Sequence, residues 1–596
     1  MPKQKQKQNK PSLKSLSSLN PYVNQYKWAL LFAIVLAFAG AIFSLIGPNK
    51  LSDMTNLITD SFKGAMSPNF DGSIDIAGIN RIAWLLVILY SLAALFTYIQ
   101  GVIMAVITQK ITKKLRSNIE NKMTRLPLSY FDKTNFGDVL SRMTNDVDTV
   151  GQTLNQSLGT LITASSLFIG SLVMMIYTNW LMTIAAVLAT VLGFMMTGVI
   201  MGMSQKYFKA QQQNLGALNG YVEEAYNGHQ IMKAFNGEAK AKVAFNDLNN
   251  DLYTSARKAT YLSGLMMPLM RFVGNLGYVV VCIVGAYLCF NNKIEFGVIV
   301  AFMLYIRLFT QPLSQLAQVF NALQQTAAAS DRIFGFLAEP EMTDESDLLD
   351  KLPHPIEGYV KFDHVHFGYT PDKIIINDFS LDVKPKETVA IVGPTGAGKS
   401  TIVNLLMKFY ELMSGDIYLD ETSISQMKRE LVHEQFCMVL QDTWLFDGTV
   451  KENIIYNRQN ISDEEVIEAC KSVGVDHFIQ TLPNGYDTHL TEANNMSQGQ
   501  RQLITIARAA ISKSPFLILD EATSSVDTRT ELVVQKAMNN LMKDRTSFVI
   551  AHRLSTIKNA DKIIVLKDGD IVEQGTHDSL LAENGFYAEL YNSQFK

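Results

Sequence analysis

Apolar and charged positions are distributed differently in the two halves of the chain. Residues 149–205 are 57 consecutive positions without a Lys, Arg, Asp or Glu, whereas charged residues recur throughout the sequence after residue 340. A run of about 20 apolar residues is long enough to cross the hydrocarbon core of a bilayer as a helix. The first half therefore predicts membrane-spanning helices, and the second half predicts a soluble domain.

Six segments are apolar enough and long enough to span a membrane. The first of these runs is too long for the apolar core of a cleaved signal peptide, and five more runs follow it. An even number of spans places both ends of the chain on the same side of the membrane. The six segments cover residues 28–47, 82–108, 158–178, 180–203, 268–290 and 296–320.

The basic residues between the spans indicate their orientation. Five lysines lie within the first 14 residues, and the connections at 109–157 and 204–263 carry many Lys and Arg residues. The opposite connections are poorer in them, and the second has none. Because Lys and Arg are enriched in cytoplasmic loops, we expect both termini to be cytoplasmic. The expected location is a cell membrane, with the plasma membrane of a bacterium as the favoured one.

The two basic connections are predicted to be helical hairpins. They contain few Gly or Pro residues and have apolar residues at three- and four-residue intervals, as at Leu115, Ile119 and Met123. Helices of about 20 residues would extend roughly 30 Å from the membrane before the chain returns. Glycine interrupts the pattern near residues 133–138 and 227–231, where we expect the hairpin tips. A solvated stalk without a binding partner is the alternative.

Composition adds little beyond this division. The chain has 596 residues, 48% of them hydrophobic and 18% charged, and its net charge of −4 gives no indication of nucleic acid as a partner. The absence of CxxC spacing favours a reduced protein facing the cytosol, without disulfides or zinc. The four cysteines are Cys282, Cys289, Cys437 and Cys470.

The soluble half contains a phosphate-binding loop. A buried strand expected at 389–392 is followed by GPTGAGKS at 393–400 and by an apolar helix, which is the sequence context of a P-loop. Glycine lets backbone N–H groups approach phosphate, and the helix amino terminus favours an anion. We expect Lys399 to contact the β- and γ-phosphates, Ser400 to bind Mg²⁺ and Thr401 to lie near the α-phosphate. The nucleotide-binding residues predicted here are Gly393, Pro394, Thr395, Gly396, Ala397, Gly398, Lys399, Ser400 and Thr401.

Four more polar residues follow buried strands. Asp520 and Glu521 come after the strand expected at 516–519. Asp520 is expected to hold Mg²⁺, and Glu521 to polarise the attacking water as general base. His552 would contact the γ-phosphate, and Gln441 has an amide that would reach the metal and the water. A solvated turn for the two carboxylates and a structural role for the histidine are the alternatives.

Together these motifs resemble those of the ATP-binding cassette (ABC) family, and the resemblance extends over essentially the whole chain. It implies ATP hydrolysis with Mg²⁺, carried out by Glu521, His552 and Gln441. The matching parts are Tyr369 as the aromatic residue that stacks on adenine, 393–400 as the Walker A motif, Gln441 as the Q-loop, 496–500 as the signature, 516–521 as the Walker B motif, 524–527 as the D-loop and His552 as the switch histidine.

The fold that this resemblance implies is an α-helical transmembrane domain followed by an α/β nucleotide-binding domain. Six spans with long inner hairpins, fused ahead of the nucleotide domain, are similar to a half-transporter of the type IV exporter class. The hairpin tips would be coupling helices that rest on nucleotide-binding domains. The expected parts are a cytoplasmic tail at 1–25, a transmembrane domain at 26–325 with coupling helices near 133–138 and 227–231, a linker at 326–356 and the nucleotide-binding domain at 357–596.

The signature departs from the family pattern. In this family two nucleotide domains dimerise head to tail, and each ATP lies between the Walker A motif of one and the signature of the other. The usual signature is Leu-Ser-Gly-Gly-Gln, but residues 496–500 read MSQGQ, with Gln498 in place of the first glycine. A long side chain at a position of close approach should weaken or reshape the contact. The signature residues predicted to contact nucleotide are Ser497, Gln498, Gly499 and Gln500.

This asymmetry suggests one half of a heterodimer. The intact Walker residues of this chain would form a hydrolysing site with a partner's regular signature, while its own MSQGQ would close a weakened site. In this respect the chain resembles a subunit of the bacterial heterodimeric multidrug exporters, in which one chain carries an altered signature. A variant signature that is tolerated in a homodimer is the alternative.

The predicted function is ATP-driven export of hydrophobic or amphipathic compounds, such as drugs or lipids, by alternating access. Arg307 lies about 11 residues into the sixth span, roughly 16 Å deep, where a charge is costly unless it faces protein or water. We read it as facing a cavity, with a structural ion pair as the alternative. A homodimeric lipid or peptide exporter and a nucleotide-gated channel or regulator remain alternatives. Glu521 and His552 favour turnover over gating.

Overall fold

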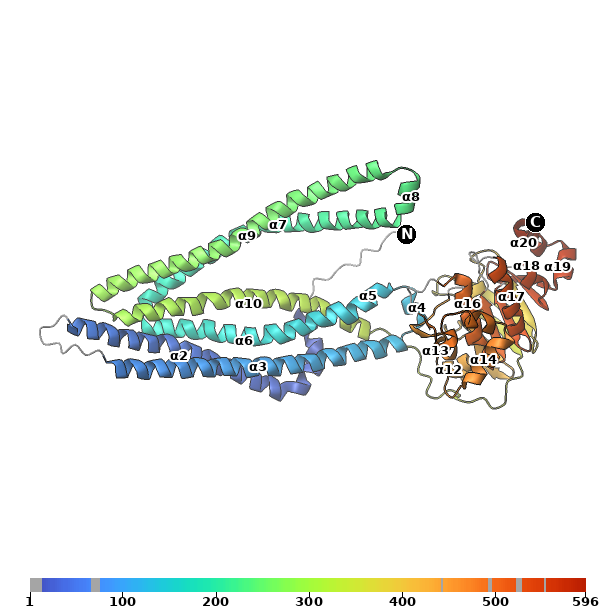
Figure 1. The fold of residues 1–596 in the computed structure, drawn as a ribbon, viewed down its shortest axis with the longest axis horizontal. Helices are drawn as coiled ribbons and strands as arrows, with labels where there is room; N and C mark the ends of the chain where they lie inside the picture. Colours follow the sequence, from blue (N-terminus) through green and yellow to red (C-terminus); the bar gives the residue numbers. More distant parts are fainter. Residues whose placement is uncertain are drawn as a thin grey trace. The chain divides into compact units, whose positions relative to one another are not determined.

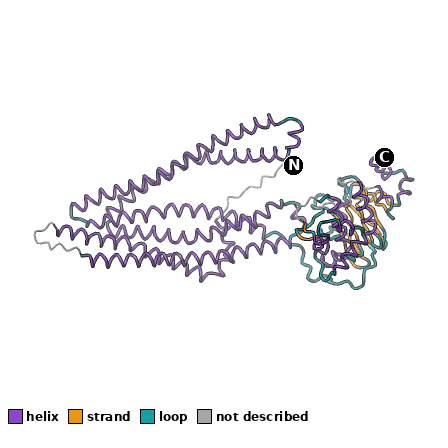
Figure 2. Tube along the Cα trace, viewed as in Figure 1, coloured by secondary structure: helices purple, strands orange, loops and turns teal. Residues whose placement is uncertain are grey.

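The computed structural model describes residues 13–65, 75–440, 443–490, 496–520, 528–550 and 554–595. It divides into two compact units. The first comprises Met1–Thr124 and Phe136–Glu339, and the second comprises Arg125–Asn135 and Pro340–Lys596. Helices make up the first unit, whereas the strands lie in the second (Figure 2).

Within the described residues, six helices are long and apolar enough to cross a membrane. This confirms the six spans predicted from the apolar runs. Short helices precede the first span, namely η1 (Leu13–Leu19), α1 (Asn20–Val23) and η2 (Asn24–Tyr26). The long helices are α2 (Lys27–Ala65), α3 (Ile76–Arg125), α6 (Val147–Thr178), α7 (Trp180–Asn227), α9 (Glu238–Phe290) and α10 (Phe296–Leu337) (Figure 1).

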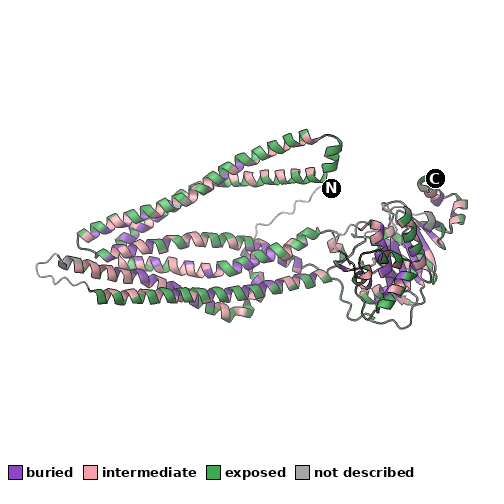
Figure 3. Cartoon of the chain, in the orientation of Figure 1, coloured by how far each residue is buried: buried purple, intermediate pink, exposed green. Residues whose placement is uncertain are grey.

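The long helices expose apolar side chains along much of their length. Trp84, Leu192 and Ile283 are 67%, 62% and 64% exposed, and such residues recur along the spans (Figure 3). A soluble protein rarely exposes large contiguous apolar surfaces, whereas lipid covers them without cost. The exposure pattern therefore supports the assignment of these helices to the membrane.

The core of the helical unit lies where α10 packs against α2, α6, α7 and α9. Phe302 and Tyr305 of α10 are fully buried in it, and the Tyr305 hydroxyl donates a hydrogen bond of 3.2 Å to the backbone carbonyl of Leu45 in α2. Near its carboxyl end, α10 is tied to the start of α6 because Arg332 donates from Nε to the buried carboxylate of Asp146 over 2.8 Å. These contacts fix α10 against the neighbouring spans.

Two connections of the helical chain contain short helices. Between α3 and α6 lie α4 (Leu128–Phe131), α5 (Phe136–Ser141) and η3 (Arg142–Asp146), a π-helical turn. Between α7 and α9 lies α8 (His229–Ala234). Turns at residues 132–134 and at 228 stand beside α4 and α8, close to the predicted tips. Whether these helices couple to nucleotide-binding domains stays a prediction.

The second unit is an α/β domain with two main sheets. An antiparallel sheet has the order β2-β1-β4-β5, and a larger sheet has the order β12-β11-β3-β10-β9-β6. The central strands of the larger sheet are parallel, and β12 joins it antiparallel. A small sheet pairs β7 (Gly448–Thr449) with β8 (His489–Leu490). The other strands are β1 (Val360–Phe367), β2 (Ile376–Val383), β3 (Thr388–Val392), β4 (Ser414–Leu419), β5 (Thr422–Ser423), β6 (Phe436–Val439), β9 (Phe516–Asp520), β10 (Thr546–Ile550), β11 (Lys562–Lys567) and β12 (Asp570–Gly575).

Helices cover both faces of the parallel strands, which are buried almost completely (Figure 3). Near-continuous apolar runs such as those of β3 and β9 are typical of parallel strands covered on both sides. This confirms the predicted fold class, a helical membrane part followed by an α/β domain. The helices of this unit are α11 (Lys399–Leu406), α12 (Arg429–Gln435), α13 (Val450–Ile455), α14 (Asp463–Ser472), α15 (Asp476–Gln480), α16 (Gln498–Ala510), α17 (Thr528–Met542), α18 (Leu554–Lys558), α19 (His577–Glu583) and α20 (Phe586–Phe595), with the short turns η4 (Ile424–Gln426) and η5 (Gly485–Asp487).

Candidate functional site

The loop between β3 and α11 has the backbone that its glycines predict. Gly396 and Gly398 adopt φ angles of +87° and +103°, a left-handed region in which a side chain is strained. A Cβ on Gly398 would also lie 2.8 Å from Cδ1 of Ile376. Gly398 is the N-cap of α11, so these conformations bring the loop into the amino terminus of that helix, where an anion is favoured.

Lys399 reaches back across this loop. Its Nζ donates hydrogen bonds to the carbonyl oxygens of Gly393, at 2.7 Å, and Pro394, at 3.0 Å. Burial lowers the pKa of Lys399, and the nearby charge of Asp520 partly opposes this shift. The cation therefore lies inside the loop and within electrostatic reach of the carboxylate that ends β9.

The residues predicted to bind Mg²⁺ fit a hard cation as far as they are described. Ser400 is exposed in the first turn of α11, and Asp520 ends β9 near Lys399. Mg²⁺ prefers oxygen ligands and usually takes one or two from protein and the rest from phosphates and water. A hydroxyl and a carboxylate beside a phosphate-binding loop match this preference.

Tyr369 lies beside the same helix. It is 40% exposed, and its hydroxyl is 3.2 Å from Oγ1 of the buried Thr401. Asn404 donates to that hydroxyl from Nδ2 over 3.4 Å. The Tyr369 ring thus stands next to the phosphate-binding helix with part of its surface open, a position suited to stacking against a flat base. Thr401 serves here as a partner of Tyr369, a contact that the sequence did not reveal.

The signature residues begin helix α16. Ser497 is its N-cap and accepts a hydrogen bond of 3.2 Å from the backbone N–H of Gln500, whose side chain accepts one of 2.9 Å from the N–H of Ser497. This capping box occupies the Gln500 side chain but leaves the Ser497 hydroxyl proton free to be donated. Gly499 is buried, and Gln498 is partly exposed at the first position of the helix. Residues 491–495, just ahead of the signature, are outside the described chain.

Three predicted catalytic residues, Gln441, Glu521 and His552, also fall outside the residues that the structure describes. Their roles stay predictions. The strands that would position Glu521 and His552 are described, since β9 and β10 are adjacent and parallel. Parallel neighbours bring their carboxyl ends to the same edge of the sheet, the edge at which Asp520 lies.

Sequence reasoning missed one aromatic residue of this region. The Tyr410 ring lies 5.1 Å from the Tyr369 ring in an edge-to-face arrangement. Tyr410 is in the segment that follows α11, so its aromatic character in KFY was visible in the sequence. Its contact with Tyr369 was not visible, because the two residues are 41 positions apart and β2, β3 and α11 lie between them in the sequence.

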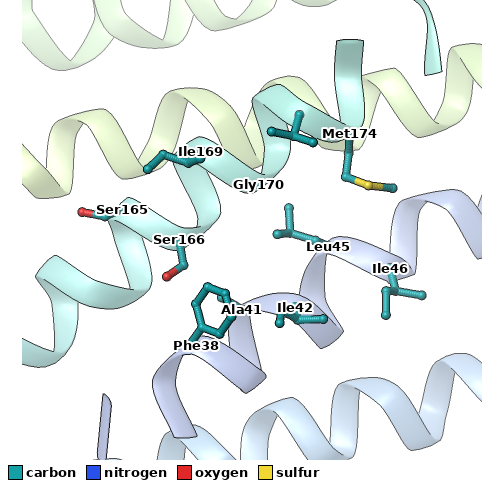
Figure 4. Close-up of a pocket in the computed structure, with 11 residues that line it drawn as sticks. Phe38, Ala41, Ile42, Leu45, Ile46, Ser165, Ser166, Ile169, Gly170 and Met174 are labelled. Carbon is teal, nitrogen blue, oxygen red and sulfur yellow. The ribbon is translucent and has the colours of Figure 1, made fainter. Parts of the chain in front are cut away.

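The helical unit has an apolar groove between α2 and α6. The groove holds about 420 Å³, and Figure 4 shows lining residues from both helices, among them Phe38 and Leu45 of α2 and Ile169 of α6. Hydroxyl groups come only from Ser165 and Ser166 among the lining residues. Arg307, which we expected to face a cavity, is exposed on α10 and does not line this groove.

Both parts of the chain match known protein families. Residues 30–313 match the family described as the ABC transporter transmembrane region, and residues 376–524 match the family described as ABC transporter. The first range includes most of the six apolar segments, and the second includes the phosphate-binding loop, α11, the signature and β9, whereas Tyr369 and β10 lie outside both ranges.

Three relatives illustrate the similarity. The fatty acid ABC transporter ATP-binding/permease protein of Mycobacterium tuberculosis is 45% identical over 518 residues, which are 87% of this chain and 82% of the relative. An uncharacterized ABC transporter ATP-binding protein of Bacillus subtilis is 37% identical over 596 residues, 99% and 96% of the two chains. The ATP-dependent lipid A-core flippase of Syntrophus aciditrophicus is 33% identical over 544 residues, 90% of each.

Proposed function

The chain belongs to the ABC transporter family and is an ATP-driven exporter of half-transporter type, and from this premise we propose that it exports lipid-like amphiphiles as one half of a heterodimer. Membership confirms the resemblance read from the motifs, including ATP hydrolysis coupled to transport. The substrate, the identity of the second subunit and the roles of single residues are the proposed parts.

The observation that carries the proposal is the combination of six spans with an intact phosphate-binding site in one chain. Lys399 lies inside the loop and near Asp520, and Ser400 lies in the first turn of α11. Lys399 would bind the β- and γ-phosphates, and Ser400, Asp520 and Gln441 would hold Mg²⁺, which when bound offsets phosphate charge. Glu521 would accept the proton of the attacking water.

The coupling of this chemistry to transport is a shift between two conformations. ATP contacts both nucleotide domains and so favours the closed pair, in which the cavity opens outward. Hydrolysis removes the γ-phosphate contacts, and the pair loosens. The cavity then faces the cytoplasm again, because the ligand has lost its differential affinity for the closed state.

Gln498 supports unequal sites. It occupies the first position of α16, next to the N-cap Ser497, where a small residue would let the helix end approach a partner's nucleotide. The loop of this chain keeps the glycines at 393, 396 and 398 that its own site needs. A second subunit with a regular signature would complete the hydrolysing site, and the weakened site would contain MSQGQ.

The hairpin of α7 and α9 supports a partner as well. At its end Tyr226, Ile231 and Phe235 are 82%, 68% and 81% exposed, although the surrounding segment is polar and extends beyond the apolar part of the spans. We place the partner's nucleotide-binding domain against this tip. The equivalent surface on this chain includes the exposed Trp444 and Phe446, which would receive the partner's tip.

The groove between α2 and α6 supports a substrate with an acyl chain. Its walls are apolar (Figure 4), and its volume falls within the range of roughly 300–1,000 Å³ typical of small-molecule sites. Ser165 and Ser166 supply hydroxyls beside it, which suit a polar head group. Two relatives are named for a fatty acid and for lipid A-core, which agrees with a lipid-like cargo.

Transport in vesicles tests this function. The full-length chain, purified with any subunit that accompanies it, is reconstituted and supplied with a fluorescent long-chain fatty acid and MgATP. We expect ATP-dependent movement of the fatty acid, lost in Glu521→Gln. Movement of apolar drugs without fatty acid would reject the lipid-like substrate, and purification as a single polypeptide with full activity would reject the heterodimer.

A further inference from the structure

Two segments of the second compact unit lie side by side, namely the connection that follows α3 and the chain that follows α10. Arg125–Asn135, which includes α4, belongs to the same compact unit as the nucleotide-binding domain. The chain that enters this domain after α10 lies beside it, because the N–H of Met342 donates a hydrogen bond of 2.9 Å to the carbonyl of Arg125. Arg125 also pairs with Glu341 at 3.8 Å. The chain that follows α10 therefore lies beside the last residue of α3.

Charged residues hold residues 408–411, the segment that follows the phosphate-binding helix α11. The side chain of Lys408 is buried, donates to the carbonyl of Met427 over 2.6 Å and pairs with Glu345 at 3.2 Å. Arg429 pairs with Glu345 at 2.8 Å and also with Glu411. The pairs among Lys408, Arg429 and Glu345 are largely buried, and buried ion pairs are costly to break, so they anchor the start of this segment at Lys408.

Tyr410 lies in the middle of this segment and contacts both the tip and the nucleotide site. Its hydroxyl donates a hydrogen bond to the carboxylate of Asp132, directly after α4. Its ring packs edge to face against Tyr369, with centroids 5.1 Å apart, and Tyr369 is bonded to Thr401 of α11. An unbroken chain of contacts thus runs from Asp132 to the helix that binds phosphate.

The chemistry of Tyr410 suits a fixed hydrogen-bond donor. Burial, followed by the hydrogen bond to Asp132, raises the pKa of the Tyr410 hydroxyl above its ordinary value. The hydroxyl therefore keeps its proton at physiological pH and donates it to a carboxylate, an arrangement stronger than a bond between neutral groups.

We propose that Tyr410 is a positioning residue that holds Tyr369 in the orientation needed for adenine and links adenine binding to the tip at Asp132. The proposal rests on the proposed function in that Tyr369 stacks on the base of ATP. Its consequence follows from linkage: if the Asp132 contact strengthens adenine binding, adenine binding strengthens the Asp132 contact by the same factor. The tip at α4 thereby senses whether the base is bound, separately from the phosphates.

The test uses the full-length chain with any subunit that accompanies it, in lipid nanodiscs. Tyr410→Phe removes only the hydroxyl, Asp132→Asn weakens the acceptor, and the double variant closes a thermodynamic cycle. Tyr359→Phe is the matched control, because Tyr359, just before β1, also donates to a carboxylate, that of Asp382 on β2. Michaelis constants for ATP are measured together with binding of ATP and of inorganic triphosphate, which lacks adenine.

We expect Tyr410→Phe and Asp132→Asn each to raise the KM for ATP by about threefold to tenfold, as for partial loss of one hydrogen bond to a charged group. The two effects should not add in the double variant. Maximal turnover and triphosphate binding should stay within twofold of the unaltered protein, a margin that separates positioning from general damage. Tyr359→Phe should leave every value unchanged.

Three outcomes would overturn the proposal. They are equal losses of ATP and triphosphate binding, additive effects in the double variant, and a KM for ATP that is unchanged in Tyr410→Phe while the unaltered protein hydrolyses ATP. An unaltered protein that neither binds nor hydrolyses ATP would instead overturn the proposed function, and this inference with it.

Discussion

The two helix ends predicted to bind nucleotide are built differently. The end at α11 is reached through glycines in left-handed conformations, with Lys399 folded across the loop. The end at α16 is closed by a capping box between Ser497 and Gln500, with Gln498 where the family pattern has glycine. The end at α11 favours an anion, whereas side chains at the start of α16 accept hydrogen bonds from backbone N–H groups of that same end. This difference supports the proposal that the chain supplies one complete half-site and one weakened half-site.

The largest difference between the two helix ends should appear when each is disabled in turn. Lys399→Ala removes the cation from the loop, and we expect ATP hydrolysis to fall by at least about 100-fold, the loss typical for a donor that stabilises a transition state. Ser497→Ala in the same chain should lower hydrolysis only slightly, since it affects the weakened site. Steady-state ATPase rates of the two variants measure the difference. Equal losses would mean that the two sites are equivalent.

The backbone of the loop is open to a second test. Gly398→Ala places a side chain at a φ of +103°, and strain of this kind costs about 1–3 kcal/mol. We expect a lower thermal midpoint and up to roughly a tenfold loss of ATP affinity. Gly216→Ala is the control, because no atom lies near its Cβ in α7 and alanine favours a helix by up to about 1 kcal/mol. A stable Gly398→Ala variant would show that the loop does not need its left-handed backbone.

Gln498→Gly tests the helix end at α16 by restoring the glycine of the family pattern. A glycine would let the start of α16 approach a partner's nucleotide, so we expect ATP hydrolysis by the complex to rise severalfold. The gain should vanish when the partner's Walker residues are disabled. Quench-flow measurements on the paired subunits would show it. A rate that does not change would mean that Gln498 is a tolerated variant without effect on closure.

The smallest expected effect concerns pH. Burial lowers the pKa of Lys399, so its charge is lost at a lower pH than for an ordinary lysine of pKa about 10.4. ATP affinity should therefore begin to fall as pH rises through the lowered value. Over the same interval the unliganded domain gains stability, because the unfolded chain binds the extra proton. Calorimetric titrations at increasing pH measure the first effect, and Lys399→Arg, which keeps its charge, should abolish the pH dependence of binding.

Local patterns made the phosphate-binding loop and the spans predictable. The loop needs glycine and lysine at fixed spacing, and a span needs an apolar run of fixed length, so both can be read from neighbouring residues. Tyr369 was identified through its resemblance to a known aromatic position, and the structure places it beside Thr401. Fold class and family were correct for the same reason.

Contacts between distant residues were not predictable. Nothing in the sequence around Asp132 indicates that it meets Tyr410, because the two are 278 positions apart. Helix α10 continues to Leu337 through residues expected to be linker, since its last turns pack near the start of α6 instead of ending at the membrane. The groove between α2 and α6 depends on how side chains of two helices interlock, which apolar periodicity alone does not determine.

Single-turnover hydrolysis by the purified complex tests the claim of unequal sites most directly. The complex is mixed rapidly with labelled MgATP, quenched with acid after one turnover and analysed for bound ATP and ADP. We predict that about half of the bound nucleotide becomes ADP quickly while the other half remains ATP, as two sites of unequal rate require. Conversion of all bound ATP at a single rate would contradict the account.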